Sequence, residues 1–170
     1  MTFKLIGAVL VFAGCGGFGF ARAASHRREE DALRQFLIAL EFMECDLSCR
    51  LTPLPQLCRN AGNVTGGCVR AFFHLLAEEL EAQVAPDAAS CVRAAVAATP
   101  GLPETLAAQL SELGATLGRF DLPGQLKGLR AASARAKLAL DALSENRDSR
   151  LRSYQTLGLC AGAALAILFL

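Results

Sequence analysis

The sequence contains no tryptophan, one tyrosine and two histidines. Because aromatic residues that favour strands are scarce while alanine and leucine dominate, the composition favours helices over sheets. The two histidines, His26 and His74, have no Ser, Cys or Asp neighbour at a spacing typical of a catalytic triad. The formal net charge is only +1, so the chain as a whole carries no field that would attract nucleic acid.

Motifs for binding phosphate or metal are also missing. Gly66 and Gly67 are not followed by the Lys and Ser or Thr of a phosphate-binding loop, and there is no CxxC pair. The seven cysteines are odd in number and irregularly spaced, which indicates reduced thiols in a cytosolic domain rather than a disulfide framework. We therefore expect no enzyme, no cofactor, no metal and no small-molecule substrate.

Four of the cysteines leave a zinc site open as an alternative. Cys45 and Cys49 would share one face of a helix, and Cys58 and Cys68 could join them around the ion. Free cysteines are common in protein cores, so we favour a structural role for these thiols.

Both ends of the sequence are apolar. Residues 3–21 carry no charge except that of Lys4, and residues 153–170 carry no charged side chain, over a length close to that needed to cross a bilayer. Arginines follow the first segment and precede the second, so the positive-inside rule favours a cytosolic middle. They are Arg22, Arg27, Arg28, Arg147, Arg150 and Arg152. The sequence predicts transmembrane helices over 1–21 and 154–170 and a cytosolic domain over 22–153.

Small residues recur every four positions in both apolar segments, at Ala13, Gly17, Ala21, Gly158, Gly162 and Ala166. Such ridges let helix backbones approach closely in lipid, so we expect the spans to pack on each other or on partner proteins. An alternative for the first segment is a lipoprotein signal ending at Cys15, although residues 12–15 match a cleavage box poorly. The domain would then lie outside the cytoplasm, in an exported lipoprotein or membrane-anchored binding protein.

The middle of the sequence has amphipathic segments separated by Pro and Gly. We predict helices over about 25–49, 68–83, 88–98 and 103–117, a short helix after Thr52, and a long helix from Asp121 towards the second apolar segment. The long helix has a stripe formed by Leu126, Leu129, Ser133, Ala136, Leu140 and Leu143. This pattern predicts an all-α fold, an antiparallel bundle of about six helices flanked by the transmembrane helices. The stripe also leaves a coiled-coil dimer open.

Two turns carry the clearest helix-boundary signals. Thr52 before Pro53 is typical of an N-cap followed by Pro at the first helical position. Gly118 is suited to end a helix in the left-handed conformation. Asp121 is suited to cap the next helix, with Pro123 in its first turn.

Three features together resemble the stage III sporulation protein AB family of endospore-forming bacteria. They are Thr52, Pro53, Leu54 and Pro55 after a long helix; Leu113, Gly114, Ala115, Thr116, Leu117 and Gly118 with Asp121 and Gln125; and a helix leading to Tyr154, Leu157, Gly158 and an apolar segment. The resemblance covers the whole chain, including the acidic segment from Glu44 to Leu47. The sequence departs from the family at Cys91 and Val92, where relatives tend to carry a Trp.

The resemblance implies a helical domain similar to the inner-membrane platform proteins of type II secretion and type IV pilus systems. It implies a scaffold in the mother-cell membrane facing the forespore, within a secretion-like channel complex that includes a cytosolic ATPase. The other subunits of that complex and a second copy of the chain are the expected partners. We also predict that the turns at 52–55 and 114–125 lie at one end of the bundle and dock the ATPase. The alternative is that these turns only cap and stop helices.

Overall fold

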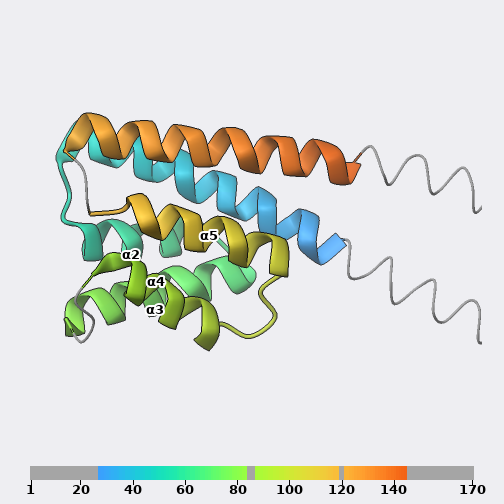
Figure 1. The fold of residues 1–170 in the computed structure, drawn as a ribbon, viewed down its shortest axis with the longest axis horizontal. Helices are drawn as coiled ribbons and strands as arrows, with labels where there is room; N and C mark the ends of the chain where they lie inside the picture. The colour runs from blue at the N-terminus through green and yellow to red at the C-terminus, as the bar shows by residue number, and fades with distance from the viewer. Residues whose placement is uncertain (1–26, 84–86, 119–120, 145–170) are drawn as a thin grey trace, which may run out of the picture.

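The structure is a computed structural model that describes residues 27–83, 87–118 and 121–144. These residues form six helices and no strand. They are a first helix at 27–50, α2 (Leu54–Val64), α3 (Gly67–Ala82), α4 (Ala88–Ala98), α5 (Glu104–Thr116) and a last helix at 122–144 (Figure 1). The predicted all-α fold is confirmed for this part of the chain.

None of the helices in the described ranges is long and apolar enough to cross a membrane. The predicted spans over 1–21 and 154–170, with their small-residue ridges and Cys15, lie outside the described residues. They stay predictions.

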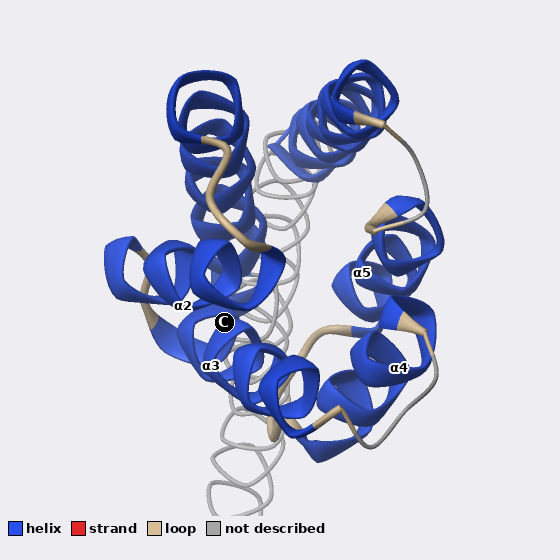
Figure 2. Cartoon of the chain, turned by 90° about the vertical axis from the view of Figure 1, so that its left-hand side faces the viewer, coloured by secondary structure: helices blue, strands red, loops and turns tan. Residues whose placement is uncertain are grey.

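The helices follow one another around a common core when the bundle is viewed end-on (Figure 2). Ion pairs join the first helix to the last helix. Glu44 on the first helix lies 2.6 Å from Arg130 on the last helix, and Glu41 lies 3.7 Å from Lys137. Because residue numbers fall on one helix as they rise on the other, the first and last helices run antiparallel.

The core is built from the apolar faces that the sequence pattern predicts. The first helix buries Leu33, Phe36, Leu40, Met43 and Leu47, α3 buries Val69, Phe72, Phe73 and Leu76, and α5 buries Leu106, Leu110 and Leu113. The rings of Phe72 and Phe73 meet edge to face, with centroids 5.2 Å apart. Each large side chain of this kind contributes about 1.5–3 kcal/mol when it leaves water, so packing holds the bundle together.

One predicted helix boundary is wrong. Thr52 is not the N-cap of α2, because the helix begins at Leu54 with Pro53 in the N-cap position and no side-chain cap. With Thr52 as N-cap, Pro55 would be the third helical residue. An N-cap side chain accepts from the second or third amide of the helix, and a proline has no N–H to give.

The other predicted boundaries have the expected geometry. Gly118, just after α5, has φ of 73°, in the left-handed region that glycine reaches at little cost. Asp121 caps the last helix, since its Oδ1 accepts the Gly124 N–H at 3.2 Å and its carbonyl oxygen accepts the Gln125 N–H at 2.9 Å. Gly118 therefore marks the end of α5, and Asp121 marks the start of the last helix.

Gly114 is a packing residue between α4 and α5. A Cβ at this position would lie 2.7 Å from Cβ of Val92, closer than real side chains approach. Cys91 and Val92, where the family tends to have a Trp, are both buried. In this chain a glycine on α5 therefore meets a branched side chain on α4.

We predict that Gly114→Ala destabilises the bundle. Overpacking costs about 1–3 kcal/mol, which outweighs the gain of up to about 1 kcal/mol that alanine brings to a helix. Thermal unfolding of the Gly114→Ala, Val92→Ala and double variants measures this. We expect the double variant to be more stable than the sum of the single effects predicts, because Val92→Ala removes the clash. Strict additivity would contradict the contact.

Candidate functional site

Three segments distant in sequence meet at one end of the bundle. The first helix ends there, α2 begins there and the last helix begins there (Figure 1). The described start of the first helix and the described end of the last helix lie at the opposite end. The first helix, residues 27–50, is about 36 Å long at 1.5 Å per residue. The meeting point is therefore far from the positions where the chain leads into its two apolar segments.

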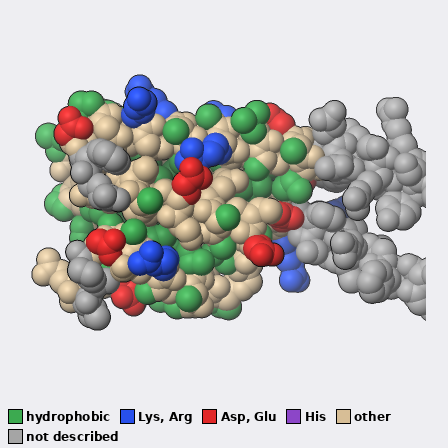
Figure 3. Space-filling view, viewed as in Figure 1, with side chains coloured by type: hydrophobic (Ala, Val, Ile, Leu, Met, Phe, Trp, Pro, Cys, Tyr) green, Lys and Arg blue, Asp and Glu red, His purple; other side chains and the backbone are tan. Residues whose placement is uncertain are grey.

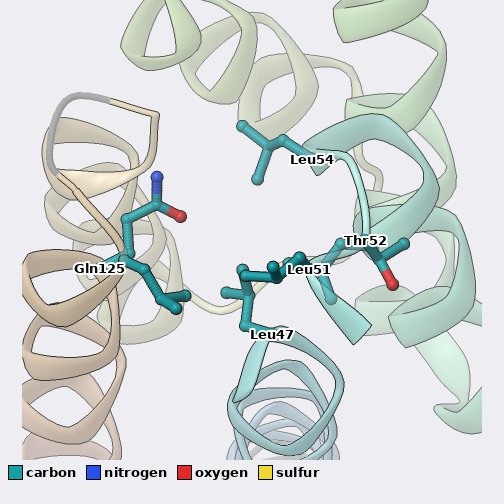
Figure 4. A pocket seen from close by; sticks show the side chains of 7 residues that line it. Leu47, Leu51, Thr52, Leu54 and Gln125 are labelled. Atoms are coloured by element: carbon teal, nitrogen blue, oxygen red, sulfur yellow. The ribbon is translucent and has the colours of Figure 1, made fainter. Parts of the chain in front are cut away.

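These segments enclose an open pocket, which we call the end pocket. It has a volume of about 220 Å³ and is lined by Leu47, Leu51, Thr52, Leu54, Leu57, Leu122 and Gln125 (Figure 4). Five of these residues are leucines, and no ionisable side chain is among them. Leu47 and Leu57 also belong to the buried core, so the floor of the pocket is continuous with the packed interior.

Leu51 lines the pocket and has a backbone conformation that is unusual for leucine. Its φ is 52°, in the left-handed region, which costs a residue with a Cβ about 1–2 kcal/mol. Its side chain is 67% exposed. The strained backbone ends the first helix and leaves a large apolar side chain beside the leucines of the pocket.

The start of α2 borders the pocket without an acidic side chain or a side-chain cap. The partial positive charge of its N-terminus is therefore not neutralised there. Arg50, the neighbour of Leu51, has a side chain that is 79% exposed. Its guanidinium lies 4.0 Å from Oδ1 of Asp46, a long contact that leaves it largely in solvent.

Asp46 itself is buried. Its side chain is only 5% exposed, and its Oδ2 has no hydrogen-bond partner among the described residues. A buried carboxylate is costly unless it is paired, and the contact with Arg50 at 4.0 Å is too long for a hydrogen bond, so it offsets this cost only in part. Sequence reasoning treated Asp46 only as part of an acidic segment.

The chain matches the family model described as "Stage III sporulation protein AB (spore_III_AB)" over residues 4–170. The chain belongs to the stage III sporulation protein AB family. A solved structure titled "Stage III sporulation protein AB (SpoIIIAB)" has a similar fold, with a TM-score of 0.63 and 19% sequence identity. The match covers 72% of this chain and 98% of that one. No curated protein sequence matches the chain.

Three of the residues in the two turns predicted for docking lie together at the end pocket. Thr52, Leu54 and Gln125 all line it. A Cβ at Gly118 would lie 3.6 Å from Cδ2 of Leu54, so the turn after α5 lies next to the start of α2. Leu117 is buried in the core instead. The two predicted turns thus lie at the same end of the bundle.

Other pocket residues were not predicted as site residues. Leu47 was named only as the end of the acidic segment, and Leu51, Leu57 and Leu122 had no predicted role in a site. The sequence around Leu51 gives little indication of a site, because this leucine is exposed beside the pocket only as a result of its left-handed backbone conformation. Pro53 and Pro55, which were predicted, act on the backbone at the start of α2 and do not line the pocket.

Arg130, Arg135 and Lys137 on the last helix are paired with carboxylates. Besides the pairs with the first helix, Arg135 lies 3.2 Å from Glu112 on α5. Basic and acidic side chains are interspersed over the face shown in Figure 3. Exposed pairs of this kind contribute at most about 1 kcal/mol each, so the buried apolar faces and not these pairs hold the helices together.

The alternative zinc site is not assembled in the structure. Cys45 and Cys49 are exposed, Cys68 is half-buried and Cys58 is buried. Among the described residues, no three His, Cys, Asp or Glu side chains come together in a way that could hold a metal ion. Burial raises the pKa of the Cys58 thiol from 9.0 to about 12, which disfavours the thiolate that a metal requires.

We predict that the thiols differ sharply in reactivity. In the native protein, iodoacetamide should modify Cys45 and Cys49 but not Cys58, with the products located by peptide mass spectrometry. Because the folded state keeps Cys58 protonated, its contribution to stability is complete below pH 9 and is lost as the pH rises towards about 12. Rapid native alkylation of Cys58 would contradict its burial.

Proposed function

We propose that this member of the stage III sporulation protein AB family is a non-enzymatic scaffold in a membrane complex of the mother cell. In this proposal the helical bundle lies in the cytoplasm, and its end pocket docks the secretion-type ATPase of a channel complex between mother cell and forespore. The observation that supports the proposal most is the meeting of both predicted turns around one open apolar pocket.

The position of the pocket fits a partner in the aqueous phase. The described ends of the first and last helices lie at the end of the bundle opposite to the pocket (Figure 1). If the apolar segments 1–21 and 154–170 span the membrane, the pocket faces away from it. The arginines beside those segments support a cytoplasmic bundle through the positive-inside rule.

The chemistry of the pocket supports binding rather than catalysis. Proton transfer in an active site needs titratable groups within reach of the reacting atoms. The pocket wall offers leucines and only two polar side chains, those of Thr52 and Gln125. A surface of this composition is suited to bury an apolar group of a partner protein.

The chain offers a matched pair of leucines for the test. Leu51 lies at the pocket and is 67% exposed, whereas Leu138 lies on the last helix outside the pocket and is 70% exposed. Neither side chain belongs to the core, so replacement of either by Asp should leave the fold intact. The two leucines have similar exposure, but Leu51 has a left-handed backbone and Leu138 lies within a helix, so circular dichroism of both variants belongs to the test.

We predict that Leu51→Asp weakens binding of the purified ATPase of the same complex to the full chain in nanodiscs. Loss of one buried leucine should lower the affinity about tenfold or more, as measured in a pull-down titration. Leu138→Asp should bind as the wild type does. Equal binding by all three proteins, with circular dichroism showing intact folding, would overturn the docking proposal.

We predict that a membrane-impermeant maleimide does not modify Cys45 or Cys49 in intact cells and modifies both after the membrane is permeabilised. Both thiols are exposed on the bundle, so they report the side of the membrane on which it lies. Peptide mass spectrometry separates them from the other cysteines. Modification in intact cells would favour the alternative of an exported lipoprotein or binding protein.

A further inference from the structure

We propose that one face of the first helix joins two copies of the chain side by side in the membrane, with their first helices parallel. We call this face the outer stripe, and it is formed by Ile38, Phe42, Cys45 and Cys49. The inference rests on the membrane anchorage of the proposed function but not on ATPase docking, since the outer stripe and the end pocket share no residue.

The outer stripe is an apolar row that the bundle leaves uncovered. Its residues follow one another at steps of four, three and four, so they lie along one side of the helix. Ile38 is 44% exposed, Cys45 and Cys49 are exposed, and Phe42 is partly buried against the core. Single exposed apolar side chains are normal on a protein surface, whereas a contiguous group of them marks an interaction site.

The end of α2 borders the stripe and adds an apolar side chain to this region. The Gly66 N–H donates to Oε1 of Gln35 at 2.8 Å, so the turn between α2 and α3 lies against the first helix, three residues before Ile38. Val64, the last residue of α2, is 45% exposed. A partner on the stripe therefore meets apolar surface from two helices.

The charged residues that border the stripe on the same helix are paired within the chain. Arg34 lies 2.8 Å from Glu30, one turn earlier on the first helix, and Glu41 lies 3.7 Å from Lys137 on the last helix. A partner therefore needs no charge to match these residues. A second stripe of the same polarity is a complementary surface.

The places where the described chain ends favour a second copy in parallel orientation. The described start of the first helix and the described end of the last helix lie at the same end of the bundle (Figure 1). The sequences beyond them, residues 1–26 and 145–170, contain the two predicted spans. Two copies anchored in one membrane by these spans point the same way. A symmetric pair then has its axis along the membrane normal, and each stripe residue faces its own counterpart.

The spacing of the stripe continues in the sequence towards the first predicted span. Counting back from Ile38 in alternating steps of three and four reaches Ala21 and Gly17, which belong to the ridge predicted to pack against another helix in lipid. Such alternating steps keep two helices in contact along their length. Arg28 and Asp31, on the same register, are opposite in charge, so each copy offers a partner for the charge of the other.

The short stripe predicts a weak dimer. It extends over about 16 Å from its first to its last residue, and it has far fewer residues than the roughly 20–30 a side of a stable interface. Confinement of both copies to one membrane supplies the effective concentration that the contact needs. The pair exchanges with single copies, so Cys45 and Cys49 still react with iodoacetamide and maleimide.

The test is cross-linking of the full chain in phosphatidylcholine vesicles by a short bismaleimide. Cys15→Ser and Cys160→Ser remove the thiols of the apolar segments, and either Cys45 or Cys49 is replaced by serine, so that one stripe thiol remains. A reagent of this kind then joins two copies only where the same thiol of each lies within reach. We expect a cross-linked dimer from both variants.

The control variant carries serine at both stripe cysteines and Leu138→Cys instead. Leu138 is 70% exposed on the last helix, so a thiol there reports random collisions between copies. It should give several-fold less dimer than either stripe thiol. The same background without Leu138→Cys gives the contribution of the remaining cysteines.

A charge swap at Ile38 tests the identity of the partner. Ile38→Glu and Ile38→Lys each place like charges opposite each other in a parallel pair, so either variant alone should lose most of the cross-linked dimer. A mixture of the two, with tags of different size, should recover the mixed dimer because opposite charges then meet. A merely structural role for Ile38 gives no recovery, and circular dichroism checks the fold of each variant.

Equal cross-linking at Leu138→Cys and at the stripe thiols, no dimer from either stripe thiol, or no recovery in the mixture would overturn the inference. If no dimer forms and the added ATPase protects Cys45 and Cys49 from maleimide, the stripe belongs to the ATPase and the inference is wrong. Leu51→Asp should leave cross-linking unchanged. Loss of the dimer and loss of ATPase docking are therefore separate results, while flotation with the vesicles tests the anchorage on which both rest.

Discussion

Antiparallel packing of the first and last helices is the constraint on which the rest of the structure depends. The apolar faces of these helices, with Phe36 and Leu129 among their fully buried side chains, provide the free energy. The ion pairs Glu44–Arg130 and Glu41–Lys137 are exposed and contribute little, but they show which residues of the two helices lie opposite each other. This pairing puts the end of the first helix and the start of the last helix at one end of the bundle. The end pocket follows from that arrangement.

The pocket remains open because the chain turns sharply where the first helix stops. Leu51 adopts a left-handed conformation, and Pro53 and Pro55 restrict the backbone immediately afterwards. A flexible turn would let the neighbouring leucines collapse into the space. A turn with two prolines loses little further entropy when a partner binds, which favours affinity through preorganisation.

Much of the fold was predictable because each helix is amphipathic and bounded by Pro, Gly or a capping side chain. Gly118 and Asp121 show this, since local backbone chemistry alone fixes what each does. Thr52 shows the limit of such signals. A cap at Thr52 would have had only the Leu54 amide to bind, because Pro55, three residues along the chain, has no N–H, and α2 begins one residue later than the cap signal predicts.

The site was predictable only in part, for a different reason. Family resemblance pointed to the turns that contain Thr52, Leu54 and Gln125, and these residues do line the pocket. Leu51 and Leu122 carry no local signal, because a leucine at a helix end has many possible environments. Their role depends on contacts between segments that lie about 70 residues apart in sequence, and such contacts depend on how whole helices pack.

The division between floor and rim explains how one small domain can serve both stability and recognition. Leu47 and Leu57 are buried, so any change there alters the core together with the pocket. Leu51 is exposed, so its side chain can vary without disturbing the core. If the chain is the scaffold that we propose, this separation would let the binding surface change while the bundle that positions the pocket stays the same. In the proposed docking function, the buried floor therefore sets the shape of the pocket, and the exposed Leu51 is the part of its wall that is free to vary.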